Sequence, residues 1–148
     1  MDHGGNIGIG SDSHISVSVV EELRLLEYGQ RLKEQQRNIA TSEDQIHTGT
    51  NLYKQALKGG ARASGFNNGK IEIGKRADLI VLDSAAATLL GTPDKHIIDR
   101  FIFNGNQNVI KHVFVSGEQV INNHKHLSEV RIYEEFKAVM ERLQKYLD

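Results

Sequence analysis

The chain has 148 residues, enough for one ordinary domain with a hydrophobic core, and its 18 Lys and Arg residues nearly balance its 19 Asp and Glu residues. The formal net charge of −1 argues against the strongly basic surface by which proteins bind nucleic acid or an anionic membrane, and no stretch approaches the roughly 18 apolar residues of a membrane span. Without cysteine the chain has neither a disulfide nor a thiol nucleophile, so any metal must be held by His, Asp or Glu. The first residues, MDHGGN, lack the regions of a secretory signal, and we expect a cytoplasmic protein without nucleic-acid or membrane partners.

The N-terminal part of the chain predicts one short strand and then a helix. Asn6–Ile9 is a brief apolar run that leads into the polar stretch Ser11–His14, a pattern typical of a buried strand that ends in a loop. Ser18 and Glu21 have the spacing of a capping box, in which side chains satisfy the unpaired amides of a helix end. The amphipathic pattern that follows predicts a helix to about Lys33.

A second helix is predicted after a polar connection over residues 33–45. It begins near Thr50 and closes at Gly65, which can adopt the left-handed conformation of a helix end. Gly59 and Gly60 lie inside it, although a glycine in a helix costs about 1 kcal/mol relative to alanine. We therefore expect them to mark close packing against a neighbouring segment.

The C-terminal half of the chain predicts short strands and a last helix. Lys70–Ile73 alternates apolar and polar residues, and Asp78–Asp83 is an apolar run bounded by carboxylates, typical of a buried strand. Further short strands, separated by turns at Asn104-Gly105 and Ser116-Gly117, are predicted around Phe101, Phe103, Val113, Val115, Val120 and Ile121. A helix is predicted from about Glu129, with a core-facing stripe of Val130, Tyr133, Phe136, Met140, Leu143 and Leu147.

This order of elements leaves the first strand without an obvious partner. A single strand beside two helices cannot satisfy its backbone hydrogen bonds, and the strands that follow are far along the chain. We therefore expect part of the fold to lie upstream of this chain.

Three stretches resemble one known group of enzymes. The segment GIGSDSHISVSVVEELRLLEYGQRL, which begins at Gly8, resembles the last barrel strand and the following helix of the amidohydrolase superfamily, and its wording is most similar to the formimidoylglutamate deiminases. The pattern over Gly69–Asp83 resembles the strand that returns to the small β-sandwich of these enzymes, and Val113–Val120 resembles the next hairpin. The resemblance is collinear and covers essentially the whole chain.

The resemblance implies an α/β fold, namely the C-terminal part of a metal-dependent hydrolase (β/α)8 barrel with part of a small composite β-sandwich. Residues 1–66 would contain the last barrel strand and the helices after it. Residues 67–127 would form the sandwich strands, and residues 128–148 the C-terminal helix.

For function, the resemblance implies a deiminase of histidine degradation, which converts N-formimino-L-glutamate and water to N-formyl-L-glutamate and ammonia. Asp12 would be a metal ligand and the catalytic proton shuttle, with Ser11 and Ser13 orienting its carboxylate. His14 would contact the substrate, although a packed or solvent-facing ring is an equal alternative. The cofactor would be a divalent metal, expected to be zinc, whose histidine ligands lie outside this chain, so we expect the chain alone to bind no metal and to be inactive.

Two other interpretations stay open. One is a catalytically silent interaction module that associates with itself or with an upstream barrel portion through its uncovered strand edge and apolar helix faces. The other is the equivalent part of a different amidohydrolase, such as a purine or pyrimidine deaminase or an imidazolonepropionase. Without the resemblance, Asp12 would be read as a turn or cap residue.

Several motifs that resemble functional sites are interpreted as structural. His124-Lys125-His126 has the letters of a metal-binding pair but follows a hairpin strand, where we expect an exposed loop. Glu21 and Glu22 are interpreted as acids at a helix start, where they complement the helix dipole. Arg24 and Arg31, beside acidic residues at helical spacing, are expected to form surface ion pairs, and His112 is expected to face outward from a strand.

Overall fold

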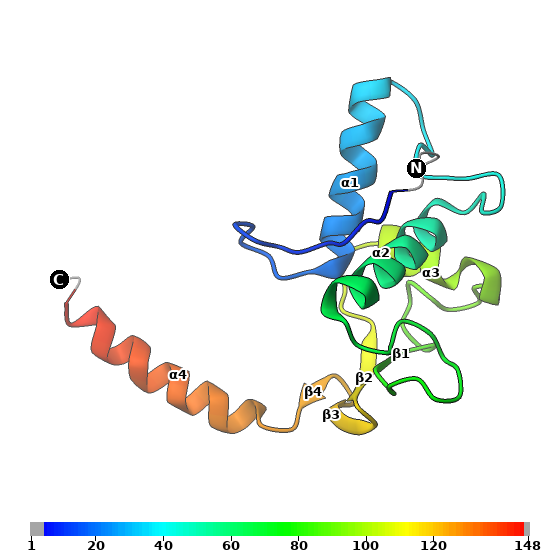
Figure 1. Cartoon of the computed structure of the whole chain (residues 1–148). Helices are drawn as coiled ribbons and strands as arrows, with labels where there is room; N and C mark the ends of the chain where they lie inside the picture. Colours follow the sequence, from blue (N-terminus) through cyan, green and yellow to red (C-terminus); the bar gives the residue numbers. More distant parts are fainter. Residues whose placement is uncertain (1–4, 147–148) are drawn as a thin grey trace.

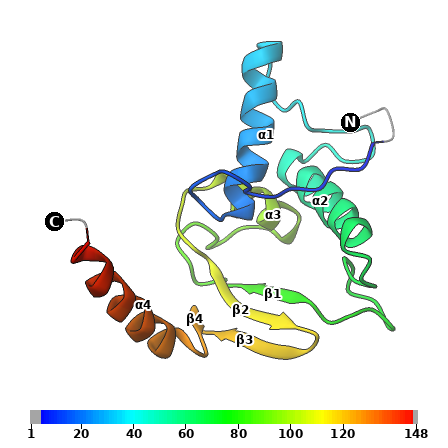
Figure 2. The same cartoon turned by 60° about the vertical axis from the view of Figure 1, so that its left-hand side comes forward.

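A computed structural model of the protein describes residues 5–146, which form a layer of helices beside a small sheet. The helical layer contains α1 (Val19–Glu34), α2 (Thr48–Ser64) and the short α3 (Ile97–Phe103), which follows the 3-10 turn η1 (Asp94–His96). The sheet contains β1 (Leu79–Leu82), β2 (Ile110–Val115), β3 (Glu118–Asn122) and the two-residue β4 (Lys125–His126). A last helix, α4 (Glu129–Gln144), leads away from both layers (Figures 1 and 2).

Helices α1 and α2 begin and end close to where the sequence predicts. The Ser18 hydroxyl accepts a hydrogen bond from the amide of Glu21 at 3.3 Å, so the predicted N-cap of α1 is confirmed. Helix α2 ends at Gly65, whose φ of 70° is the left-handed conformation that glycine adopts without strain. At Gly59 an added Cβ would lie 1.9 Å from the carbonyl oxygen of Ile7, which confirms the predicted close packing at this glycine. The same prediction is wrong for Gly60, where an added Cβ would have nothing within 4 Å.

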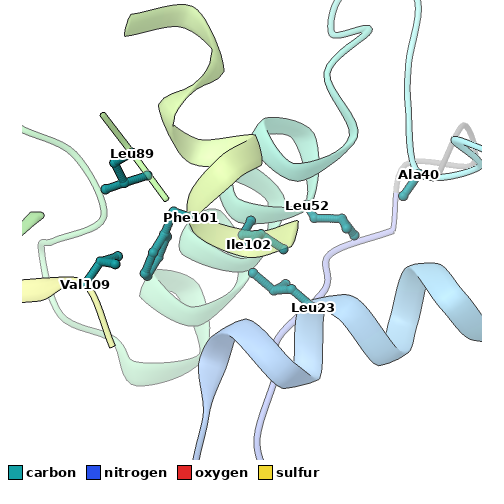
Figure 3. Packing of buried hydrophobic residues seen from close by; sticks show 7 residues of the cluster. All are labelled: Leu23, Ala40, Leu52, Leu89, Phe101, Ile102 and Val109. Atoms are coloured by element: carbon teal, nitrogen blue, oxygen red, sulfur yellow. The ribbon is translucent and has the colours of Figure 1, made fainter. Parts of the chain in front are cut away.

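The hydrophobic core lies where α1, α2 and α3 meet. Leu23 of α1, Leu52 of α2 and Ile102 of α3 are 0–1% exposed and meet at its centre (Figure 3). Each such side chain contributes roughly 1.5–3 kcal/mol when it leaves water. The other buried members of the cluster are Ala40, Leu89, Phe101 and Val109.

The sheet is antiparallel throughout, in the order β1-β2-β3-β4. The predicted turn between β2 and β3 is confirmed. Ser116 and Gly117 have φ values of 53° and 84°, and two positive φ values are expected in a two-residue hairpin turn that matches the twist of its strands. Strand β1 is also formed as predicted, but it is not buried. Ile80 and Val81 are 39% and 41% exposed, because no described element covers both faces of this strand.

Three predicted strands are wrong in the described part of the chain. Asn6–Ile9 forms no strand, because it runs along α2 and no described strand lies beside it to share hydrogen bonds. Lys70–Ile73 forms none either, and Ile71 and Ile73 are exposed. Phe101 and Phe103 belong to the seven-residue helix α3. In so short an apolar run, the spacing typical of a helix cannot be distinguished from the alternation typical of a strand.

The apolar stripe of α4 does not face a core in this chain. The predicted helix is confirmed, but none of residues 129–144 is buried, and Val130, Tyr133 and Phe136 are 61–78% exposed. Met140 and Leu143 are also exposed, and Leu147 lies outside the described residues. The periodicity therefore identifies an apolar helix face whose partner is not among residues 5–146. In the same part of the chain no helix is long and apolar enough to cross a membrane.

Candidate functional site

The candidate catalytic residue Asp12 lies on a tight turn just before α1. The amide of His14 donates to the carbonyl oxygen of Ser11 at 2.6 Å, which closes the turn over Asp12 and Ser13. Asp12 has a φ of 39°, a positive value that Asp tolerates better than most residues because its short side chain fits there. The side chains of Asp12, Ser13 and His14 are exposed and Ser11 is half-buried, so the turn presents the predicted site residues together at the surface.

The turn is connected to α1 by one side-chain contact. The Nδ1 atom of His14 lies 2.7 Å from Oε1 of Glu22, which belongs to the first turn of the helix. The His14 side chain is 54% exposed, whereas that of Glu22 is only 12% exposed. Glu22 raises the pKa of the His14 ring, first through this hydrogen bond and then through its negative charge. The interpretation of Glu22 as only a helix-dipole acid is therefore incomplete.

The described residues do not by themselves fit a divalent metal ion. Among residues 5–146 no group of three His, Cys, Asp or Glu side chains is placed to hold one, whereas a protein zinc site uses three or four such ligands. Asp12 supplies a single exposed carboxylate.

The histidines of the HKH motif have local partners of another kind. Nε2 of His124 lies 3.3 Å from Oδ2 of Asp83, and Nδ1 of His126 accepts a hydrogen bond from the amide of Ser128 at 3.1 Å. The motif is only partly the loop that the sequence predicts, because Lys125 and His126 pair with β3 as the short strand β4. The outward-facing role predicted for His112 is also incomplete, because the ring is half-buried and its Nδ1 lies 3.0 Å from Nε2 of Gln119.

An open groove of about 860 Å³ lies between residues 16–28 and residues 105–110. Arg24 is in its wall and donates to the carbonyl oxygens of Ile102 and Gly105 and to the side chain of Asn106. The predicted surface ion pair of Arg24 is therefore wrong. Its guanidinium instead holds the chain segment after α3, at the helix end where carbonyl groups lack helical partners. The residues that line the groove include neither Asp12 nor His14.

A second acidic residue has a role that the sequence did not predict. The side chain of Glu27 is completely buried, pairs with Nε of Arg31 at 2.7 Å, and accepts hydrogen bonds from the amides of Ile39 and Ala40 at 3.1 and 2.8 Å. The predicted ion pair of Arg31 is confirmed, but its partner is not on the surface. The spacing of four residues predicts the pair and carries no sign of the two distant amides.

Comparison with known proteins gives one consistent result. The family model described as the Amidohydrolase family matches residues 1–120. The chain is 44% identical over 140 residues to the formimidoylglutamate deiminase of Pseudomonas aeruginosa, a match that covers 95% of this chain and 31% of that protein. It is 27% identical over 125 residues to the 5'-deoxyadenosine deaminase of Methanopyrus kandleri, covering 84% of this chain and 28% of that protein.

Solved structures agree with these matches. The crystal structure of an amidohydrolase from Brucella melitensis superposes with a TM-score of 0.81 at 30% identity, over 95% of this chain and 31% of that one. A zinc-bound adenosine deaminase from Xanthomonas campestris superposes with a TM-score of 0.71 at 20% identity, covering 92% of this chain and 30% of that one, and so resembles this chain in fold. The chain spans about 31% of the length of the Pseudomonas aeruginosa deiminase and of the Brucella melitensis amidohydrolase. These matches confirm the resemblance that the sequence indicated.

Proposed function

Because the chain belongs to the amidohydrolase family, we propose that it is the C-terminal portion of a formimidoylglutamate deiminase. The observation that carries this proposal is the 44% identity, over 95% of the chain, to a protein of that name. The relatives named as deaminases of 5'-deoxyadenosine or 5-methylthioadenosine are 27–31% identical. The higher identity therefore favours a deiminase that acts on a formimino compound. A deaminase that acts on a nucleoside is the second candidate.

The proposed reaction needs a group that moves protons. Water adds to the formimino carbon of N-formimino-L-glutamate, and the carbon–nitrogen bond of the imino group then breaks to give N-formyl-L-glutamate and ammonia. In this proposal the Asp12 carboxylate takes a proton from the attacking water and gives it to the imino nitrogen, and it then passes the proton of the resulting hydroxyl group to the same nitrogen, which leaves as ammonia. The exposed position of Asp12 on a closed turn supports the role, because a substrate can reach the carboxylate.

The proposal includes one metal ligand in this chain and no complete metal site. Since the described residues do not form a metal site, Asp12 is proposed as one oxygen ligand of a divalent ion, expected to be zinc, whose other ligands would come from residues outside this chain. Ser11 and Ser13, which flank Asp12 in the turn, would orient its carboxylate, and His14 would contact the substrate.

We propose that this polypeptide alone is silent and associates either with an upstream barrel portion or with itself. The supporting observation is the exposed apolar face of α4 and the exposed Ile71 and Ile73, which a complete fold would cover. Purified alone, the chain should release no ammonia from N-formimino-L-glutamate, contain well under one zinc per chain and form concentration-dependent oligomers in light scattering. One zinc per chain with measurable turnover would overturn the silent-chain proposal, and a monodisperse monomer would count against self-association.

The catalytic role of Asp12 is best tested in a chimera. The chain replaces the matching 140 residues of the Pseudomonas aeruginosa formimidoylglutamate deiminase, and ammonia release is measured with N-formimino-L-glutamate and with 5'-deoxyadenosine. Asp12→Asn should lower kcat about 100-fold or more, because loss of a general acid–base typically costs 10²–10⁴-fold. The matched control is Asp44→Asn in the exposed loop between α1 and α2, which should leave kcat unchanged.

The outcomes of this experiment separate the proposals. Near-normal activity of Asp12→Asn, with a folded circular dichroism spectrum, would remove Asp12 from the mechanism. A chimera that acts on 5'-deoxyadenosine and not on N-formimino-L-glutamate would favour the nucleoside deaminase candidate.

A further inference from the structure

We propose that Glu22 is a positioning residue, whose carboxylate holds the ring of His14 and, through it, the turn that carries Asp12. The inference rests on the proposed function, because it assigns Glu22 a role in the same site. It goes beyond the resemblance, which concerns Asp12 and its immediate neighbours and assigns nothing to an acid eight residues after His14.

The contact connects a rigid element to an exposed one. Glu22 lies in the first turn of α1, where its amide donates to the carbonyl oxygen of Ser18 at 3.1 Å and its side chain is only 12% exposed. From this fixed base its Oε1 lies 2.7 Å from Nδ1 of His14, a short distance typical of a charge-assisted hydrogen bond. Asp12 itself is exposed, so the turn depends on its few bonds for a defined position.

The turn transmits this contact to Asp12. The amide of His14 closes the turn by its bond to the carbonyl oxygen of Ser11, so His14 and Asp12 belong to one four-residue unit. When the His14 side chain is held against α1, the orientation of the whole unit is restricted. Without Glu22 the unit would keep its internal bond and lose its connection to the helix.

The contact also selects one form of the His14 ring. An ionised carboxylate only accepts hydrogen bonds, so Nδ1 must carry the proton that is shared with Glu22. In the neutral ring Nε2 then has a free lone pair, and no hydrogen bond to Nε2 is present within residues 5–146. Because the ring is 54% exposed, this nitrogen can accept a hydrogen bond from an N–H of the formimino group.

Glu21 provides a matched control for these effects. It is the neighbouring acid in the same helical turn, its side chain is exposed, and its backbone amide, not its carboxylate, makes the cap bond to Ser18. Glu21→Ala therefore removes the same charge from the same helix start and leaves the contact to His14 in place. Glu22→Gln keeps an oxygen acceptor for Nδ1 and removes the charge.

The first test uses the chain itself and needs no activity. In nitrogen–proton spectra of the ¹⁵N-labelled histidine rings at a pH where His14 is neutral, the proton should be on Nδ1 in the parent chain, in Glu22→Gln and in Glu21→Ala. In Glu22→Ala it should move to Nε2, the form that a free imidazole prefers. A parent chain with the proton on Nε2, or the same spectrum in Glu22→Ala, would overturn the proposal.

The second test measures turnover of N-formimino-L-glutamate by the chimera. Glu22→Ala should lower kcat/KM about 10- to 100-fold, the usual loss when the partner that orients an active-site group is removed. Glu22→Gln should restore most of this loss, and Glu21→Ala should stay within about twofold. In a His14→Ala background Glu22→Ala should cost nothing further, because the two residues act as one unit.

The two proposals fail in different ways. If Glu22→Ala and Glu21→Ala have equal effects on kcat/KM, or if the losses from His14→Ala and Glu22→Ala simply add, Glu22 is not a positioning residue. If the parent chimera is folded and releases no ammonia, the proposed function fails, and the ring spectra still decide whether Glu22 holds His14.

Discussion

Two adjacent glycines in α2 differ in how closely other parts of the chain pack against them. A Cβ at Gly59 would lie 1.9 Å from the carbonyl oxygen and 2.5 Å from the carbonyl carbon of Ile7, whereas a Cβ at Gly60 would have nothing within 4 Å. The first contact is with backbone, which cannot move aside as a flexible side chain would. Gly59 is therefore required for the N-terminal segment to lie against α2, and Gly60 is not.

Gly59→Ala should lower the unfolding free energy by about 1–3 kcal/mol, the usual cost of overpacking, as measured by denaturant titration. Gly60→Ala is the matched control and should raise it by up to about 1 kcal/mol, because alanine is the better helix former. Equal effects of the two substitutions would show that the segment around Ile7 does not pack against α2.

Asp78 makes the stability of the fold depend on pH in the acidic range. Its carboxylate accepts hydrogen bonds from the side chain of Asn68 at 3.0 Å and the amide of Ser116 at 2.9 Å, and lies 2.9 Å from Nε of Arg76. The bond from Asn68 and then that from Ser116 lower the pKa of Asp78 below 3.8. Since the folded pKa is below the unfolded one, the stabilisation is complete above about pH 4 and is lost as the pH falls through the folded pKa.

Asp78→Asn should therefore lower the thermal unfolding midpoint at pH 7, and the difference from the parent chain should shrink as the pH falls below 4. Asp44→Asn is the control, because its exposed side chain makes no hydrogen bond within the described residues, and should change little at either pH. A pH-independent difference for Asp78→Asn would contradict the role of its charge.

At the scale of single residues, the sequence predicts local roles and misses distant ones. The cap at Ser18 and the closing glycine at Gly65 are confirmed, because their partners lie within a few residues. The roles of Arg24 and Glu27 were not predicted, because their partners lie 12 to 82 residues away and leave no periodic trace.

At the scale of elements, α2 depends on α3 for its N-terminal cap. His47 occupies the cap position without a side-chain hydrogen bond, and the Asp99 carboxylate of α3 instead accepts from the amide of Gly49 and the hydroxyl of Thr50, both at 2.8 Å. One free amide of the helix start, that of Gly49, is thus satisfied from another helix. Since α3 itself was predicted as strand, no local pattern indicated this cap.

Asp99→Ala should cost about 1–2 kcal/mol of unfolding free energy in a denaturant titration, the usual loss when a helix cap is removed. Asp94→Ala, in the exposed turn η1 just before α3, is the control and should stay within about 0.5 kcal/mol. If both substitutions have the same effect, Asp99 does not cap α2.

At the scale of the whole molecule, α4 is an addition to the fold and not part of its core. It leads away from the helices and the sheet, and none of residues 129–144 is buried (Figure 2). The sequence predicted the helix and its apolar stripe, because both follow from a period of three to four residues. It did not predict that the stripe would be uncovered, because periodicity does not identify what a face packs against.

Removal of residues 129–148 should change the unfolding free energy of the remaining chain by less than about 1 kcal/mol, since none of residues 129–144 is buried. The truncated chain should also form fewer oligomers in light scattering. Ile102→Ala at the centre of the core is the positive control and should cost about 2–5 kcal/mol. A loss as large as that of the control on truncation would show that α4 packs on the fold.

The buried carboxylate of Glu27 has a consequence for the order in which the chain becomes organised. Its bonds to the amides of Ile39 and Ala40 span only 12 and 13 residues, whereas the contacts of Arg24 with the segment after α3 span 78 to 82. Short loops close with less entropy loss than long ones, and local contacts form early in folding. During synthesis on the ribosome, α1 and the loop after it can thus form before the residues of α3 have been added to the chain.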